Sequence, residues 1–258
     1  FLSSVVLLAC MLCSCSERER SADSSEYFLL EDSVLLLNAS EAWHRFGNGN
    51  FKRQPSHSFN PGFTTSNYWL VVKIDTSTHE GLQLAIGTSQ INEIEFYTIL
   101  TDEPVKRYHT GDHKIYSSRP LPSLDFIFPL ENRTPHYLLK LDKRNESLQL
   151  TFTVKPASYF TTEAIGSSMI IGILTGIIIL MLIFGLYLTL ITKEKVYLLY
   201  ILYVAAGWLY VLSNLGYGYK YLWPDNPWFS ARARPIFTLL SLGFSLLFIE
   251  YYTGKAAY

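Results

Sequence analysis

One uncharged apolar run, from Ala164 to Thr192, constrains this chain more than any other feature of its sequence. About 20 apolar residues in a helix span the hydrocarbon core of a bilayer, and Glu163 and Lys193 close the run at its two ends. Because lipid offers the backbone no hydrogen-bond partners, we expect a transmembrane helix over about residues 164–192. It separates a polar, strand-like half of the chain from a second half that is more apolar.

Two further apolar segments follow the first, and we expect helices at about 196–215 and 235–252. Together the three segments make residues 161–258 a transmembrane region. The loop between the second and third helices is rich in Tyr and Trp, which favour the interface between membrane and water. If the polar half is exported, the first helix runs inward and this loop returns to the outer side.

The first residues of the chain have the character of an export signal, because a short apolar run is followed by small and then polar residues. The sequence Leu-Cys-Ser-Cys ending at Cys15 fits a bacterial lipobox, which makes Cys15 a candidate for lipidation and Cys10 a second one. The alternative is an ordinary cleaved signal with incidental cysteines. We expect residues 1–15 to be a signal peptide or lipobox remnant and residues 16–26 to be a linker. The start at Phe1 instead of Met suggests N-terminal truncation.

Residues 27–160 alternate apolar and polar side chains with a period of two, which places one face of a strand on a core and the other in water. The expected strand segments are 28–37, 68–75, 82–86, 93–96, 125–130, 137–142 and 148–154. A helical turn is expected at Ser40–Phe46, and chain turns at Asn60–Gly62 and Thr110–Asp112. The pattern predicts an all-β jelly roll or sandwich outside the cytoplasm.

Several classes of function are disfavoured by composition. The formal net charge of −1 argues against a nucleic-acid-binding protein, which would present a basic face. All three cysteines precede residue 16, so the polar half has none for a disulfide framework or a zinc site. His109 and His113 have the i,i+4 spacing of zinc ligands, but they bracket a turn instead of lying on a helix. We therefore expect no catalytic residue, metal or cofactor in this segment.

Aromatic residues near turns and strand ends are the candidates for ligand contact. We single out Tyr68, Trp69, Tyr97 and Tyr108, because flat rings beside polar groups can stack on the faces of sugars. The alternative for each ring is a place in the core, where large aromatic side chains contribute much of the buried area.

Small residues in the first helix are the candidates for helix contact. Gly172 and Gly176 have the GxxxG spacing that allows two helices to approach closely in lipid, either within the chain or in a homodimer. Background glycine frequency is the alternative. Glu250, near the end of the third segment, is the one carboxylate within it and is a weaker functional candidate.

Several short stretches carry a family resemblance through their order and spacing. They are Gly62–Leu70, Thr110–Asp112, Arg119–Pro120 and Asp125–Leu130 in the polar half, and Lys195–Tyr200, Gly216–Gly218 and Tyr221–Asp225 in the membrane half. In these stretches the chain resembles the bacterial seven-transmembrane receptors with diverse intracellular signalling modules (7TM-DISM). The polar half is similar to the extracellular sensor domain of the second type in that family, and the resemblance covers about residues 26–258.

The resemblance implies a receptor in the bacterial inner membrane whose extracytoplasmic domain, a jelly roll similar to carbohydrate-binding modules, senses a small molecule or a glycan. Family members have seven helices and end in an output module such as a histidine kinase, a diguanylate cyclase or a phosphatase. Three helices are expected here and no output module, which suggests that the chain is the input half of such a receptor and is also truncated after Tyr258.

Two other classes of function stay open. In the first, the sandwich contacts another protein and the helices only anchor it, as in a structural or accessory membrane protein. In the second, the chain is a transporter or a membrane-embedded enzyme, which would place several ionisable residues inside the spans.

Overall fold

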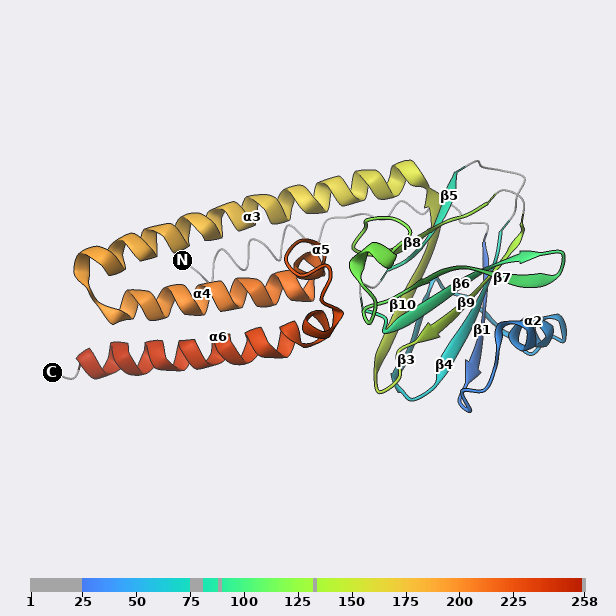
Figure 1. Cartoon of the computed structure of the whole chain (residues 1–258), viewed down its shortest axis with the longest axis horizontal. Coiled ribbons are helices and arrows are strands. Elements are labelled where there is room, and N and C mark those ends of the chain that lie inside the picture. The colour runs from blue at the N-terminus through green and yellow to red at the C-terminus, as the bar shows by residue number, and fades with distance from the viewer. Residues whose placement is uncertain (1–24, 75–80, 88–89, 132–133, 257–258) are drawn as a thin grey trace.

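The computed structural model describes residues 25–74, 81–87, 90–131 and 134–256, which form a β domain followed by a group of long helices (Figure 1). The β domain consists of β1 (Glu26–Asp32), α2 (Ala39–Gly47), β2 (Lys52–Gln54), β3 (Ser58–Thr64), β4 (Asn67–Lys73), β5 (Leu82–Ile86), β6 (Glu93–Leu100), β7 (Glu103–Thr110), η1 (Tyr116–Ser118), β8 (Phe126–Pro129), β9 (His136–Asp142) and β10 (Glu146–Pro156). The helices that follow are α3 (Ala157–Thr192), α4 (Lys195–Asn214), α5 (Tyr217–Tyr221) and α6 (Pro227–Ala256).

The strands form two antiparallel sheets that pack face to face. The larger sheet has six strands in the order β2-β1-β4-β9-β6-β7, and the smaller has four in the order β3-β10-β5-β8. The core between them is rich in large apolar side chains, and Phe96 of β6 stacks on Phe128 of β8 with ring centroids 4.7 Å apart. The expected all-β sandwich is therefore confirmed.

A second, smaller core covers the outer face of the six-stranded sheet. Helix α2 packs there against side chains of β4, β6 and β9, among them Trp69, Val71 and Leu138. The helix begins with a capping box, in which the Asn38 side chain accepts a hydrogen bond from the Glu41 backbone N–H and the Glu41 side chain accepts one from the Asn38 backbone N–H. Part of the sheet is consequently buried on both faces.

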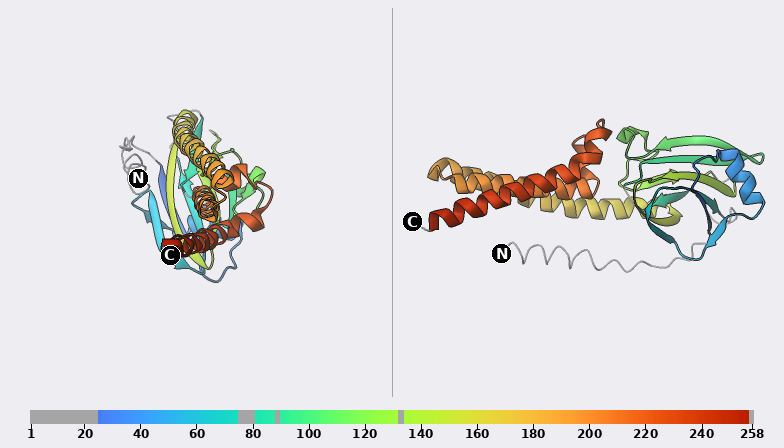
Figure 2. Two further views of the ribbon diagram at one scale, coloured as in Figure 1. Left: turned by 90° about the vertical axis from the view of Figure 1, so that its left-hand side faces the viewer. Right: turned by 90° about the horizontal axis from the view of Figure 1, so that it is seen from below.

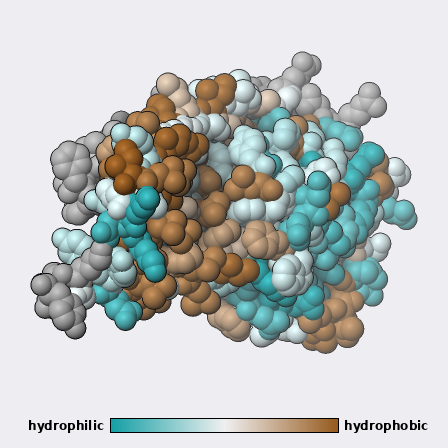
Figure 3. All heavy atoms as spheres, turned by 60° about the vertical axis from the view of Figure 1, so that its left-hand side comes forward, coloured by the Kyte–Doolittle hydropathy of each residue, from teal (hydrophilic) through white to brown (hydrophobic). Residues whose placement is uncertain are grey.

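Among the described residues, three helices are long and apolar enough to cross a membrane, α3, α4 and α6. Strand β10 runs directly into α3, and α4 lies between α3 and α6 (Figures 1 and 2). Their outward-facing side chains are largely apolar, whereas teal residues predominate over much of the β domain in Figure 3. The expected membrane region with three helices is confirmed, and α5 lies at the end of the helices that faces the β domain.

The third helix begins earlier than its sequence suggested. A start at Pro235 was expected because the apolar run begins there, directly after Arg232 and Arg234, yet α6 begins at Pro227 and continues through Pro235. The Asn226 side chain accepts a hydrogen bond from the Phe229 backbone N–H, which caps this earlier start. Proline is tolerated inside membrane helices more often than inside soluble ones.

Two expectations in the β domain were wrong. The strand expected at 28–37 ends at Asp32, because the Asp32 carboxylate accepts a hydrogen bond from the Leu37 backbone N–H and Leu35 has a positive φ of 61°. The turn expected at Asn60–Gly62 lies within β3, an edge strand where proline is tolerated. The candidate cysteines Cys10 and Cys15 and the proposed signal lie outside the described residues.

Candidate functional site

Two of the four candidate aromatic residues point into the core between the sheets. Tyr68 is 5% exposed and Tyr108 is partly buried against the same core. The Tyr68 hydroxyl lies 3.2 Å from Thr64 Oγ1, and burial raises the pKa of Tyr68. The Tyr68 ring therefore has no face open to solvent for stacking, and the Tyr108 ring packs on the core with only part of its surface exposed.

The other two candidates, Trp69 and Tyr97, lie on the outer face of the six-stranded sheet. Trp69 is 1% and Tyr97 is 8% exposed, and their ring centroids are 6.3 Å apart. The ammonium group of Lys140 lies 5.6 Å from the Trp69 ring, and that of Lys106 lies 5.9 Å from the Tyr97 ring. The structure thus brings these two candidates together at the border between the α2 core and a charged surface.

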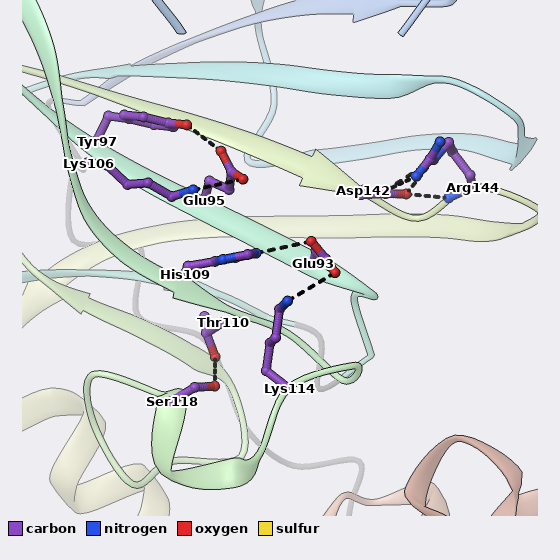
Figure 4. A network of polar contacts seen from close by, with 10 residues as sticks. All are labelled: Glu93, Glu95, Tyr97, Lys106, His109, Thr110, Lys114, Ser118, Asp142 and Arg144. Carbon is purple, nitrogen blue, oxygen red and sulfur yellow. Dashed lines mark hydrogen bonds and ion pairs between the residues drawn. The ribbon is translucent and has the colours of Figure 1, made fainter. Parts of the chain in front are cut away.

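That charged surface continues across β9, β6 and β7. Lys140 lies opposite Trp69 on one side and Glu95 on the other, and Glu95 lies opposite His109. Figure 4 shows the side chains that extend from these strands and from the loop after β7. The contacts are Tyr97 Oη to Glu95, Lys106 Nζ to Glu95 Oε1 at 2.9 Å, His109 Nε2 to Glu93 Oε2 at 3.0 Å, Lys114 Nζ to Glu93 Oε1 at 3.3 Å and Arg144 Nη2 to Asp142 Oδ2 at 2.6 Å. We call the residues of these contacts, together with Lys140, the charged face.

Hydrogen bonds hold the carboxylates of the charged face in their ionised form. Burial alone would raise the pKa of Glu93, but its contacts with His109 and Lys114 outweigh that effect and lower the pKa. The pKa of Asp142 is likewise lowered, because contacts with Arg144 exceed the effect of burial. These carboxylates therefore stay charged in the native state down to acidic pH.

A second group of contacts joins the β domain to the membrane helices. The β-domain partner is the loop between β7 and β8, residues 111–125, which we call the domain loop; its membrane partner is residues 215–226, the outer loop. The Tyr116 backbone N–H donates to the Pro224 carbonyl at 2.9 Å, and the Tyr219 hydroxyl donates to the Lys114 carbonyl. The rings of Tyr116 and Tyr219 meet edge to face, with centroids 5.6 Å apart.

The domain loop is held in shape by the buried guanidinium of Arg119, whose side chain is 3% exposed. Its Nη1 donates to the carbonyls of Ser123 at 3.0 Å and Leu124 at 2.6 Å. Its Cζ lies 4.1 Å from the centroid of the Phe126 ring and 5.8 Å from that of Tyr219. One side chain therefore supports both the loop and the tyrosine that reaches it from the membrane half.

Asp112 is the anionic partner of Arg119 in this loop. Its Oδ1 lies 3.8 Å from Arg119 Nη2, and its backbone N–H donates to the Ile91 carbonyl at 2.7 Å. Burial raises the pKa of Asp112 to about 7, although the nearby cations Arg119, Lys143 and Arg234 act in the opposite direction. The loop thus contains a carboxyl group that changes charge near neutral pH.

Gln90 makes a further connection between the two halves of the chain. Its Nε2 donates to the carbonyl of Asn214, the last residue of α4, at 3.2 Å. Its Oε1 accepts a hydrogen bond from Arg234 Nη1 in α6 at 2.6 Å. A single amide side chain of the β domain therefore contacts two membrane helices. We call these contacts, with those of the domain loop and outer loop, the junction.

Sequence reasoning did not single out the junction residues as functional. Their signal lay in the stretches that carry the family resemblance, since Asp112 and Arg119 come from the β half and Pro224 from the membrane half. The structure shows that these separate stretches meet.

The glycines expected to contact another helix have no such contact among the described residues. No atom lies within 4 Å of a Cβ built on Gly172 or Gly176, whereas one built on Gly185 would lie 2.8 Å from Ile201 of α4. The close contact between α3 and α4 is therefore at Gly185. Glu250 is exposed near the far end of α6.

Comparison with protein families gives two matches that divide the chain as the fold does. Residues 24–155 match the family described as 7TMR-DISM extracellular 2, which covers the β domain. Residues 167–257 match the family described as 7TM diverse intracellular signalling, which covers the helices. No curated protein matches the chain.

Proposed function

The chain belongs to the seven-transmembrane receptors with diverse intracellular signalling modules, and on this premise we propose that it is the ligand-sensing input of a receptor in a bacterial inner membrane. The β domain is its extracellular sensor. The ligand is a soluble molecule, a carbohydrate in the leading version of the proposal. The signal passes through the helices to a cytoplasmic output module.

The junction supports this proposal most directly, because it connects the β domain to the membrane helices by more than the chain itself. A domain attached only through the β10–α3 connection could rotate without affecting α4 or α6. Here the domain loop hydrogen-bonds to the outer loop, and Gln90 hydrogen-bonds to both helices. A change in the position of the β domain therefore acts on three helices at once.

The ligand surface in this proposal is the charged face next to Trp69 and Tyr97. It offers carboxylates and cations in alternation, which suits a ligand with many hydroxyl groups because both donors and acceptors are available. A ligand shifts the receptor only by its difference in affinity between two arrangements of the domain on the helices. Rearrangement of the Glu93 contacts reaches the junction directly, since Lys114 belongs to the domain loop.

The test uses the full chain in lipid nanodiscs, titrated with soluble glycans, peptidoglycan fragments and small organic acids. We expect at least one probe to raise the melting temperature and to change hydrogen exchange in residues 214–224. Glu95→Gln should weaken that binding. The control Glu103→Gln, which changes an exposed carboxylate at the start of β7, should leave the binding unchanged.

Binding that alters exchange only within the β domain would favour the accessory protein, in which the helices serve as an anchor. If no probe changes the melting temperature, the β domain binds no soluble glycan, peptidoglycan fragment or small organic acid of the kinds tested. That result would reject the proposal that the ligand is a carbohydrate.

A further inference from the structure

A polar cleft of about 500 Å³ lies beside the junction, between the β domain and the membrane helices. Its lining residues are Gly87, Gln90, Lys143, Glu146, Ser147, Leu148, Gln149, Thr151, Asn214 and Arg234. Its lining shares no residue with the charged face, although Lys143 lies between Asp142 and Arg144 in the turn that joins the two sheets. Small-molecule sites in proteins have volumes of about 300–1,000 Å³, so the cleft is large enough for an organic ligand.

Two cations line the cleft, one from each half of the chain. Lys143 comes from the turn between β9 and β10 and is 4% exposed, with Nζ 2.5 Å from Glu146 Oε2. Arg234 comes from α6 and donates to the neutral amide of Gln90 at 2.6 Å. Among the described residues, Glu146 pairs with Lys143 and Asp112 with Arg119, and Asp112 acts on Arg234 only through a longer-range charge interaction. Most guanidinium donors of Arg234 are thus available to a ligand.

The charges of the cleft favour an anion. Within the lining, Lys143 and Arg234 are opposed by one carboxylate, that of Glu146, and the other residues are neutral. The carboxyl of Asp112, outside the lining, also acts on both cations, but burial raises its pKa to about 7, so it is largely uncharged below that pH. Several of the neutral lining residues carry hydroxyl or amide groups that can donate to a bound oxygen. Arginine and lysine together form the usual protein partners of phosphate, because guanidinium binds two oxygens at once and ammonium adds a point charge.

The position of the cleft matches the level of lipid headgroups. Asn214 ends α4 at the side that faces the β domain, and Arg234 lies early in α6 on that side. The exposed rings of Tyr221 and Trp228 nearby are typical of the membrane interface. A phosphate group can therefore reach the cleft from the lipid or from the surrounding solution.

We propose that this cleft binds a phosphate group, held between Lys143 of the β domain and Arg234 of α6. The phosphate belongs to a lipid headgroup or to a soluble phosphomonoester. Bound there, it bridges the two halves of the chain beside the Gln90 contacts. Binding of the phosphate does not depend on the signalling role, and each can be tested without the other.

The first arm of the test titrates the full chain in detergent with inorganic phosphate by calorimetry, at ionic strength held constant with chloride. We expect Arg234→Gln to weaken binding about tenfold or more, because a charge-assisted contact is lost. The matched control is Arg232→Gln, two residues away on the same helix, where the guanidinium lies over the Trp228 ring and outside the cleft.

The second arm adds phosphatidylglycerol, or diacylglycerol as a lipid without phosphate, and counts retained lipids by native mass spectrometry. Retention of phosphatidylglycerol that requires Arg234 identifies the lipid as the source. Binding of inorganic phosphate that requires Arg234, without selective lipid retention, identifies a soluble source. If neither arm depends on Arg234, the proposal is overturned.

A gain of affinity separates binding from misfolding. Glu146→Gln removes the carboxylate that holds Lys143, so we expect it to tighten phosphate binding at least severalfold, a result that a damaged protein would not give. Unchanged or weaker binding in a variant with wild-type melting temperature would contradict the place of Lys143 in the site.

Discussion

The hydroxyl of Tyr219 donates a hydrogen bond to the backbone carbonyl of Lys114, and so ties a short helix between two membrane spans to a loop of the β domain. The two residues are 105 positions apart in the sequence. Two further contacts surround this bond: the rings of Tyr116 and Tyr219 pack edge to face, and the guanidinium of Arg119 lies near the Tyr219 ring. Through these contacts the outer loop of the membrane half packs directly against the domain loop of the β domain.

Replacement of Tyr219 by Phe should weaken the junction while keeping the aromatic ring. Loss of one net hydrogen bond costs about 1 kcal/mol, so we expect a lower melting temperature of the full chain in nanodiscs. Tyr221→Phe is the control, because Tyr221 lies on the same helix and is 62% exposed. Equal effects of the two substitutions would show that the hydroxyl of Tyr219 contributes nothing.

The contribution of Asp112 to the stability of the protein should fall as the pH rises from about 4 to about 7. Burial raises the native pKa of this carboxyl from 3.8 to about 7. The native state therefore binds the proton more tightly than the unfolded state, and the resulting stabilisation is complete below pH 4 and lost above pH 7. Arg119, Lys143, Arg234 and Glu146 face the same group.

The measurement is urea unfolding at pH 5 and pH 8 with Asp112→Asn, whose side chain is neutral at both. We expect a smaller loss of unfolding free energy between the two values than in the wild type. The exposed carboxylate Glu103, replaced by Gln, should leave the wild-type pH dependence intact. An Asp112→Asn protein with the wild-type dependence would rule out Asp112 as its source.

Gly111 allows the start of the domain loop to pass close to the strand beside it. Its φ is 144°, and a Cβ built there would lie 2.2 Å from the Asn92 carbonyl oxygen. Gly111→Ala should therefore destabilise the protein by about 1–3 kcal/mol, the usual cost of such strain. Gly47→Ala, at the end of α2, meets no described atom within 4 Å and should change thermal unfolding little. Similar melting temperatures for both variants would be inconsistent with the close approach.

Of the glycines of α3, Gly185 should tolerate a large side chain least. Its Cβ position is 2.8 Å from Ile201 Cγ1 of α4, so Gly185→Leu must push the helices apart, and overpacking typically costs about 1–3 kcal/mol. Gly166→Leu is the control on the same helix, since no described atom is near it. If both substitutions lower the melting temperature in detergent by the same amount, the result would argue against this contact.

The general architecture could be predicted because it depends on local periodicity. The alternation at Glu93, Ile94, Glu95 and Phe96 correctly placed the two carboxylates outward and the two apolar side chains in the core. An uncharged run long enough to cross a bilayer likewise identified α3. Each of these features is decided by neighbouring residues alone.

The surroundings of the aromatic residues depend instead on what covers each face. Tyr68 and Trp69 point to opposite faces of β4. Tyr68 is buried in the core between the two sheets, and Trp69 is buried because α2 covers the outer face, which would otherwise be open. No sequence pattern within β4 could reveal that α2 packs on its outer face. The junction was missed for a similar reason, since Lys114 and Tyr219 meet only through the packing of the whole chain.

The most direct test of the account is hydrogen exchange of the domain loop after a change made on the membrane side. We would compare residues 111–119 in the full chain carrying Tyr219→Phe and in the chain carrying Tyr221→Phe, both in nanodiscs. The account predicts faster exchange of these amides with Tyr219→Phe alone, because the outer loop holds the domain loop in place. Identical exchange in the two variants would show that the β domain and the membrane helices are not coupled through this junction.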